Sequence, residues 1–264
     1  MPTRDASSID SPEILSVVFH PRKEFGNPFG AQAFEAIDFP VAPGVSIGGR
    51  FYAAEKDKLT ILFFHGNGEI AADYDDIAGQ YVSMGVNFMP VDYRGYGRSS
   101  GTPTVTAMLS DARSVLQQAM DWLAVRGYCQ KIIVMGRSLG SASALEIALV
   151  HPDKIVGLIV ESGFADTVGL VRRLGAWLPD QPDPLRQTEK IAGYHGPVLI
   201  IHGTDDVIIP VTDAEAQYRA CPSTEKKLLR IKGAGHNDLL YVGFREYMQA
   251  ISEFVQGLQG ESRT

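Results

Sequence analysis

A serine between glycines is the feature of this 264-residue sequence with the clearest chemical meaning. Residues 136–140 have the form G-x-S-x-G, with Ser138 at the centre. They follow an apolar, strand-like run, Ile132–Met135, and lead into a helix-like stretch, Ser138–Val150. A sharp turn from a strand into a helix exposes a serine hydroxyl at a helix N-terminus, which favours negative charge. The pattern predicts that Ser138 is a nucleophile; the alternative is that it only caps the helix.

A serine nucleophile needs a general base, and the positions of the six histidines leave one candidate. On a fold in which the nucleophile lies between a strand and a helix, the chain order is serine, acid, histidine. His236 follows the nucleophile and the candidate acids, and it lies in a glycine-rich loop after the last apolar run. We therefore expect His236 to be the base, with an ordinary surface histidine as the alternative.

Three carboxylates are candidates for the acid that orients this base. Asp205 and Asp206 are adjacent and directly follow the apolar run Val198–Ile201. Glu161 ends the run Ile155–Val160 and reaches the same carboxyl edge of the expected sheet. Chain order alone leaves all three open.

Acyl transfer also needs backbone N–H groups that bind the developing oxyanion. One donor is expected from Leu139, the residue after the nucleophile. The other is expected from the glycine-rich turn His65–Gly68, which follows the apolar run Leu59–Phe64. Asn67 is the first choice for this donor and Gly68 the second, whereas His65 is expected to support the loop.

Strand-like runs alternate with helix-like stretches over most of the chain. This alternation predicts a single α/β domain over residues 1–264, with a mostly parallel central sheet and helices on both faces. Opening strands are expected at Ile14–His20, Gln32–Pro40 and Val45–Ala53. In these segments apolar and polar residues alternate, and β-branched and aromatic residues are present. The remaining runs and helical stretches are Val86–Val91, Leu228–Ile231, Ala71–Met84, Thr104–Arg126, Thr212–Ala220 and Phe244–Leu258.

The interval 162–197 breaks this alternation and is expected to form a small lid over a fairly open site. It contains one short helix-like stretch, Val168–Leu178, followed by three prolines. The alternative is an ordinary long connection.

Composition and charge narrow the classes of partner. The formal net charge of −7 and the scattered basic residues predict no nucleic-acid binding. No apolar run reaches 18 residues and no signal-peptide core follows Met1, so we expect a cytoplasmic protein without a membrane span. Cys129 and Cys221 fit a reducing compartment. Metal-binding spacings and phosphate loops are absent from the sequence, so neither a metal nor a cofactor is expected.

Four motifs in order resemble the α/β-hydrolase superfamily: residues 65–68, 92–99, 136–140 and 202–210 with the later pair 235–236. The resemblance covers residues 59 to the C-terminus and implies an acid four residues after His202, which is Asp206 rather than Asp205. It also implies that Asp92 and Arg94 are structural. The chain is most similar to small, nearly capless esterases and thioesterases and to serine-aminopeptidase-like members.

These features predict a serine hydrolase that cleaves a small-molecule carboxylic ester or thioester through an acyl-enzyme. One alternative is a peptidase with the same three residues, in which Glu69 or Glu161 captures the substrate amine. The other is a non-catalytic binding protein on the same fold. The sequence gives no indication of the oligomeric state.

Overall fold

A mixed sheet runs through the whole computed structural model, which describes residues 6–25 and 33–260. Within these ranges the strands are β1 (Glu35–Ala42), β2 (Val45–Phe51), β3 (Thr60–Phe64), β4 (Asn87–Val91), β5 (Ile132–Arg137), β6 (Ile155–Glu161), β7 (Val198–Gly203) and β8 (Lys226–Ile231). Their order across the sheet is β1-β2-β4-β3-β5-β6-β7-β8. Strands β3 to β8 are parallel to one another, whereas β2 is antiparallel to both of its neighbours, β1 and β4. The predicted, mostly parallel sheet is confirmed.

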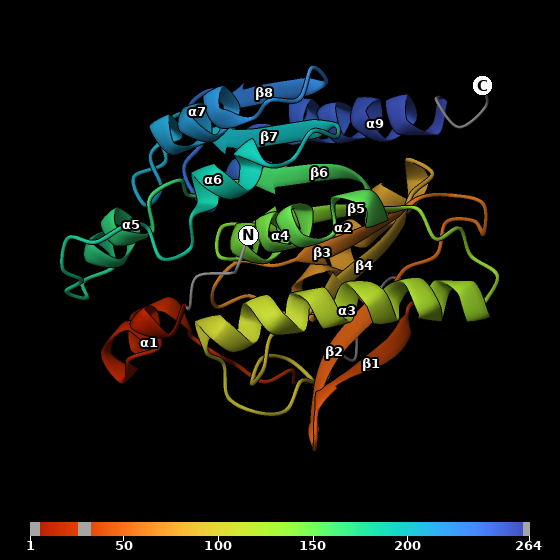
Figure 1. The fold of residues 1–264 in the computed structure, drawn as a ribbon. Helices are drawn as coiled ribbons and strands as arrows, with labels where there is room; N and C mark the ends of the chain where they lie inside the picture. The colour runs from red at the N-terminus through yellow and green to blue at the C-terminus, as the bar shows by residue number, and fades with distance from the viewer. Residues whose placement is uncertain (1–5, 26–32, 261–264) are drawn as a thin grey trace.

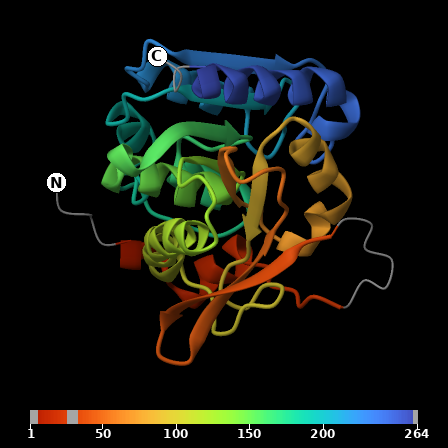
Figure 2. The ribbon, with the colours of Figure 1, turned by 90° about the vertical axis from the view of Figure 1, so that its right-hand side faces the viewer.

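Helices cover both faces of this sheet (Figures 1 and 2). One face packs against α3 (Val105–Val125), α4 (Gly140–Val150), α6 (Gln187–Ala192) and α7 (Val211–Ala220). The other packs against α2 (Asp75–Ser83) and α9 (Phe244–Gly260). Strand β3 shows why two cores form, because Leu62 and Phe64 enter the first core and Ile61 and Phe63 the second.

The parallel register brings strand ends together at one edge. Phe64 pairs with Gly136, and Arg137 pairs with Glu161, so β3, β5 and β6 end side by side. The loops that follow these strands therefore meet above the same edge, where sites form in open α/β sheets. Helices α1 (Pro12–Val18) and α5 (Thr167–Arg173) lie at this end of the molecule (Figure 1).

The strand predicted over Ile14–His20 is wrong, because this segment forms helix α1. Its apolar and β-branched residues favour a strand, but the residues before them start a helix. Ser11 accepts a hydrogen bond from the Ile14 N–H (3.4 Å), and Pro12 occupies the first helical position.

Other boundaries differ less. Residue 32, the first of the strand predicted over Gln32–Pro40, lies outside the described residues. The helix predicted over 71–84 divides into a short 3-10 helix, η2 (Ala71–Tyr74), and α2. The helix predicted over 168–178 ends at Arg173, before Gly175 with its φ of 96°. The small elements η1 (Ala6–Ile9), η3 (Pro152–Lys154) and α8 (Leu239–Val242) complete the order.

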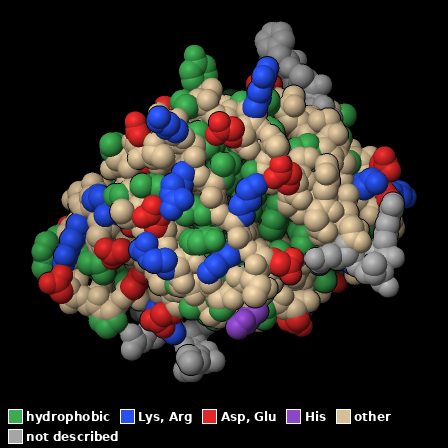
Figure 3. Space-filling view, turned by 90° about the horizontal axis from the view of Figure 1, so that it is seen from above, with side chains coloured by type: hydrophobic (Ala, Val, Ile, Leu, Met, Phe, Trp, Pro, Cys, Tyr) green, Lys and Arg blue, Asp and Glu red, His purple; other side chains and the backbone are tan. Residues whose placement is uncertain are grey.

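Strand β8 forms one edge of the sheet, and charged side chains mark it. Lys227 and Arg230 are exposed on this strand and pair with Glu253 and Glu215. Viewed from above in Figure 3, basic and acidic side chains are interspersed over the molecule. Charged edge strands of this kind resist pairing with a second chain. Among the described residues, no helix combines the length and apolar character that crossing a membrane requires.

Candidate active site

The turn from β5 into α4 places Ser138 in a strained backbone conformation. Its φ is 51°, in the left-handed region that non-glycine residues rarely adopt, and its N–H donates to the Glu161 carbonyl (2.8 Å). The flanking glycines allow the close contacts of this turn. A Cβ on Gly136 would lie 2.2 Å from the Gly140 oxygen, and one on Gly140 would lie 2.0 Å from the Phe64 oxygen. The G-x-S-x-G pattern is therefore required by packing at both glycines.

The structure brings together Ser138, His236 and Asp206, which come from the loops after β5, β8 and β7. His236 Nε2 lies 2.9 Å from Ser138 Oγ, and His236 Nδ1 lies 2.7 Å from Asp206 Oδ2. When Nδ1 carries a proton and donates a hydrogen bond to the carboxylate, Nε2 is free to accept the serine hydroxyl proton. This geometry can activate a hydroxyl as a nucleophile.

Asp206, and not its neighbour, faces the histidine. It is 6% exposed, and its Oδ1 accepts the N–H groups of Ile208 (2.9 Å) and Ile209 (2.8 Å). Asp205 is exposed and accepts the hydroxyl of Thr204 (2.7 Å). Of the two adjacent carboxylates, Asp206 is therefore the one placed to orient His236.

The surroundings of Asp206 keep it ionised. Burial raises the pKa of this carboxyl, but hydrogen bonds from His202 and His236 outweigh burial and hold the pKa below its ordinary value. A carboxylate that remains negative fixes the His236 tautomer and stabilises the imidazolium form.

The two expected oxyanion donors both line the cavity beside Ser138. Within residues 6–25 and 33–260, no hydrogen bond uses the backbone N–H of Asn67 or of Leu139. Asn67 lines the cavity, whereas Gly68 is not among its lining residues and instead offers its carbonyl to Arg22 (2.7 Å). These contacts favour Asn67 over Gly68, in agreement with the order of preference from the sequence.

Arg137 is a residue that the sequence reasoning missed. Its guanidinium pairs with Glu69 and lies 3.2 Å from Glu161 Oε1. It also donates to the His236 carbonyl (2.9 Å) and to Asn237 Oδ1 (3.2 Å). One largely buried side chain, 11% exposed, thus connects the loops after β3 and β8 to the turn that holds Ser138.

The two carboxylates around Arg137 are themselves anchored. Glu69 accepts the Gly66 N–H and the Tyr74 hydroxyl, both at 2.7 Å. Burial raises the pKa of Glu69, but the Arg137 charge and these hydrogen bonds lower it overall. Glu161 accepts the Tyr247 hydroxyl (2.8 Å), and burial raises its pKa despite Arg137. The sequence does contain a signal for this cluster, because Glu69, Arg137 and Glu161 are opposite charges at or just after the ends of β3, β5 and β6.

A cavity of about 270 Å³ opens beside Ser138 and is mostly apolar. Part of its wall comes from the expected lid, because Phe164, Leu170 and Leu174 line it. Trp177 does not, since its side chain is 71% exposed. The remaining apolar lining residues are Ile9, Val18, Val105, Met108, Leu139, Val171, Leu185, Ile208 and Ile209.

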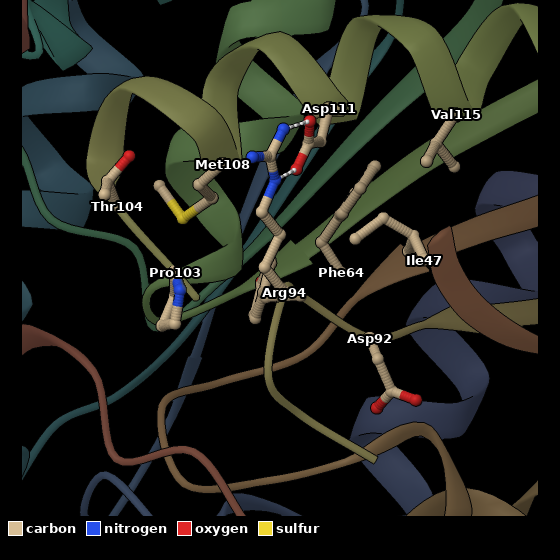
Figure 4. A pocket seen from close by; sticks show the side chains of 11 residues that line it. Ile47, Phe64, Asp92, Arg94, Pro103, Thr104, Met108, Asp111 and Val115 are labelled. Atoms are coloured by element: carbon tan, nitrogen blue, oxygen red, sulfur yellow. Dashed lines mark hydrogen bonds and ion pairs between the residues drawn. The ribbon is translucent and has the colours of Figure 1, made fainter. Parts of the chain in front are cut away.

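A second cavity, shown in Figure 4, has room for about one water molecule at 10 Å³. Arg94 makes two hydrogen bonds to Asp111 across it, at 2.7 and 2.8 Å. Asp92 points away and accepts the Ala71 N–H (2.8 Å). These contacts fit the structural role expected for Asp92 and Arg94.

His65 is fully buried beneath the glycine-rich turn. Its Nδ1 lies 2.8 Å from the Gly66 carbonyl, and its own carbonyl accepts the Tyr93 hydroxyl (2.6 Å). These contacts fit a residue that supports the loop. Within the described ranges, no cluster of three or more His, Cys, Asp or Glu side chains is arranged to hold a metal ion.

The sequence matches a known family and several known proteins. Residues 55–181 match the family model described as serine aminopeptidase, S33. Over 215 residues the chain is 30% identical to alpha/beta hydrolase domain-containing protein 17C of Mus musculus, which covers 76% of this chain and 61% of that protein. The chain thus spans about three fifths of the length of this curated relative.

Two solved structures share the fold. An esterase from Pyrococcus furiosus aligns with a TM-score of 0.74 at 19% identity, over 89% of this chain and 98% of that one. A soluble variant of monoglyceride lipase from Saccharomyces cerevisiae aligns with a TM-score of 0.65 at 17% identity, over 90% and 99%. These likenesses show the fold, and the sequence matches show that the chain belongs to the α/β-hydrolase superfamily.

Proposed function

We propose that this protein is a serine hydrolase that cleaves a carboxylic ester or thioester by two-step acyl transfer. The observation that carries the proposal is the hydrogen-bonded series Ser138–His236–Asp206 at the mouth of an apolar cavity. A serine that only capped its helix would not need a histidine within hydrogen-bond distance. A purely structural histidine–carboxylate pair would not need the serine.

In the first step, His236 Nε2 accepts the Ser138 proton while Oγ attacks the substrate carbonyl carbon. The carbonyl electrons move onto oxygen, and the N–H groups of Asn67 and Leu139 stabilise that charge. The oxyanion then collapses, the bond to the leaving group breaks, and His236 gives its proton to the departing oxygen or sulfur. Asp206 stabilises the imidazolium between these two transfers.

In the second step, a water molecule replaces the leaving group beside His236. Nε2 accepts a proton from water as its oxygen attacks the acyl carbon, and the same donors bind the second oxyanion. Collapse returns the proton to Ser138 Oγ and releases the carboxylic acid. The water-derived oxygen remains in the acid, so atoms and charge balance.

A peptidase is the second candidate, and the matched family model, described as serine aminopeptidase, favours it. Capture of a substrate amine needs a carboxylate without another cationic partner. Glu69 and Glu161, the two candidates, both pair with Arg137. This pairing supports ester or thioester cleavage over aminopeptidase activity.

The test is labelling with a fluorophosphonate probe, followed by hydrolysis assays on matched substrates. The wild type should label and Ser138→Ala should not, while both retain the same circular dichroism spectrum. A p-nitrophenyl ester, a thioester with the same acyl group and an alanine p-nitroanilide then separate the reaction classes. Absence of labelling in the folded wild type would favour a non-catalytic binding protein.

A further inference from the structure

The N-terminal arm, defined as residues 9–24, is attached to the loops around the site. His20 N–H donates to Asn67 Oδ1 (2.8 Å), and the Asn67 amide nitrogen lies 2.8 Å from His20 Nδ1. Arg22 donates to the Gly68 carbonyl (2.7 Å) and pairs with Asp73. The loop that carries the expected oxyanion donor is therefore held from outside by the arm.

The other end of the arm is attached to α3. Asp10 Oδ1 accepts the Val105 N–H (2.6 Å) at the start of that helix, an N-terminal position that favours a carboxylate. Between these attachments, α1 contacts α5, and Ile14 and Phe19 are buried. The arm thus has fixed ends and a packed middle.

Two apolar residues of this arm line the cavity beside Ser138. Ile9 is 1% exposed and Val18 is partly buried. They face the same cavity as Leu170 of α5 and Leu174, which directly follows that helix. The cavity is therefore bounded on one side by the expected lid and on another by the arm.

The position of His236 determines which part of the substrate contacts the side of the cavity that the arm forms. A leaving group must accept a proton from His236 Nε2, so it departs beside the loop after β8, where Arg137 and Asn237 line the cavity. The acyl chain extends from the same carbonyl in the other direction. The arm lies in that direction, because it binds the loops after β3 and β4, across β5 from the base.

We propose that the arm forms a wall of the acyl-binding pocket and that Val18 limits the length of the acyl chain. The proposal rests on the proposed function and adds a substrate class to it, namely esters or thioesters of apolar acids. Burial of each added methylene against this wall contributes about 0.8 kcal/mol until the chain reaches Val18. Beyond that length the chain clashes with α1.

The experiment compares p-nitrophenyl acetate, octanoate and dodecanoate for the wild type and three full-length variants. Val18→Trp should lower the octanoate-to-acetate ratio of kcat/KM by about tenfold or more, because its bulk fills the pocket. Val18→Ala should shift the preference toward dodecanoate. Ser16→Trp is the matched control, since it adds the same side chain at an exposed position of α1 and should keep the wild-type profile.

A second measurement tests ligand binding in the pocket independently of catalysis. Octanoate binding to Ser138→Ala, measured by calorimetry, should weaken about tenfold or more when Val18→Trp is added. An unchanged chain-length profile and unchanged octanoate binding in Val18→Trp would overturn the proposal. Loss of fluorophosphonate labelling in the wild type, with octanoate binding that still depends on Val18, would overturn the hydrolase function and leave the pocket wall in place.

Discussion

The two sides of the cavity are built in different ways. On the side of the base, Ser138, His236 and Arg137 are fixed by hydrogen bonds and by glycines that admit no side chain. On the opposite side, Val18 and Leu170 line the wall with apolar contacts. Directional bonds define one geometry, whereas apolar packing accepts side chains of similar volume. The difference suggests that reaction chemistry and chain-length preference can change independently.

The largest expected effect is on the directional side. Asp206→Asn should lower kcat on the order of 10⁴-fold, because the amide no longer fixes the tautomer of His236. Asp205→Asn is the matched control, since this adjacent carboxylate is exposed and does not contact the base. Steady-state kinetics on one p-nitrophenyl ester measures both. Equal losses in the two variants would contradict the assignment of the acid.

Removal of the largely buried Arg137 guanidinium should have the next largest effect. Arg137→Met leaves Glu69 and Glu161 without their cation and should reduce the free energy of unfolding by about 3–5 kcal/mol. It should also lower kcat, because the His236 carbonyl loses its donor. Urea denaturation and kinetics measure the two effects.

The control for Arg137 is an exposed ion pair. Arg230→Met breaks the contact with Glu215 on the edge strand, where both side chains are at least 30% exposed, and should cost about 0–1 kcal/mol. A similar loss in both variants would mean that the buried cluster contributes no more than a surface pair.

The depressed pKa of Asp206 predicts a pH dependence of stability with a definite sign. Because the folded protein holds this pKa below its ordinary value of 3.8, the ionised carboxyl stabilises the folded state. That contribution is complete above the ordinary pKa and is lost as the pH falls through the folded-state pKa. The stability gap between wild type and Asp206→Asn, measured by urea denaturation, should therefore narrow below about pH 4. A constant gap down to about pH 2 would contradict it.

The hydrogen-bonded side and the apolar side of the cavity also differ in how much of each can be predicted from the sequence. Ser138, His236 and Asp206 were predicted from motif, chain order and resemblance, because strict local geometry leaves a pattern in the residues. The strand predicted over Ile14–His20 was wrong, since apolar β-branched residues suit either element and only Ser11 and Pro12 indicate the helix start.

Contacts between distant segments explain what the sequence could not give. Arg137 occupies a variable position of its motif, and two of its partners, Glu69 and His236, lie 68 and 99 residues away along the chain. The contacts of Val18 with the cavity likewise depend on the packing of α1 against α5, which no local pattern encodes.

The smallest effect should come from the exposed part of the expected lid. Trp177 is 71% exposed and does not line the cavity, so Trp177→Ala should change the free energy of unfolding by less than about 0.5 kcal/mol. The octanoate-to-acetate ratio should also stay at the wild-type value, whereas Leu170→Ala, which removes a lining side chain, should change it. A lower ratio in Trp177→Ala would mean that segment 162–197 closes over the acyl chain during turnover. In that case the apolar side of the cavity would be mobile, while hydrogen bonds hold the side that carries His236 in place.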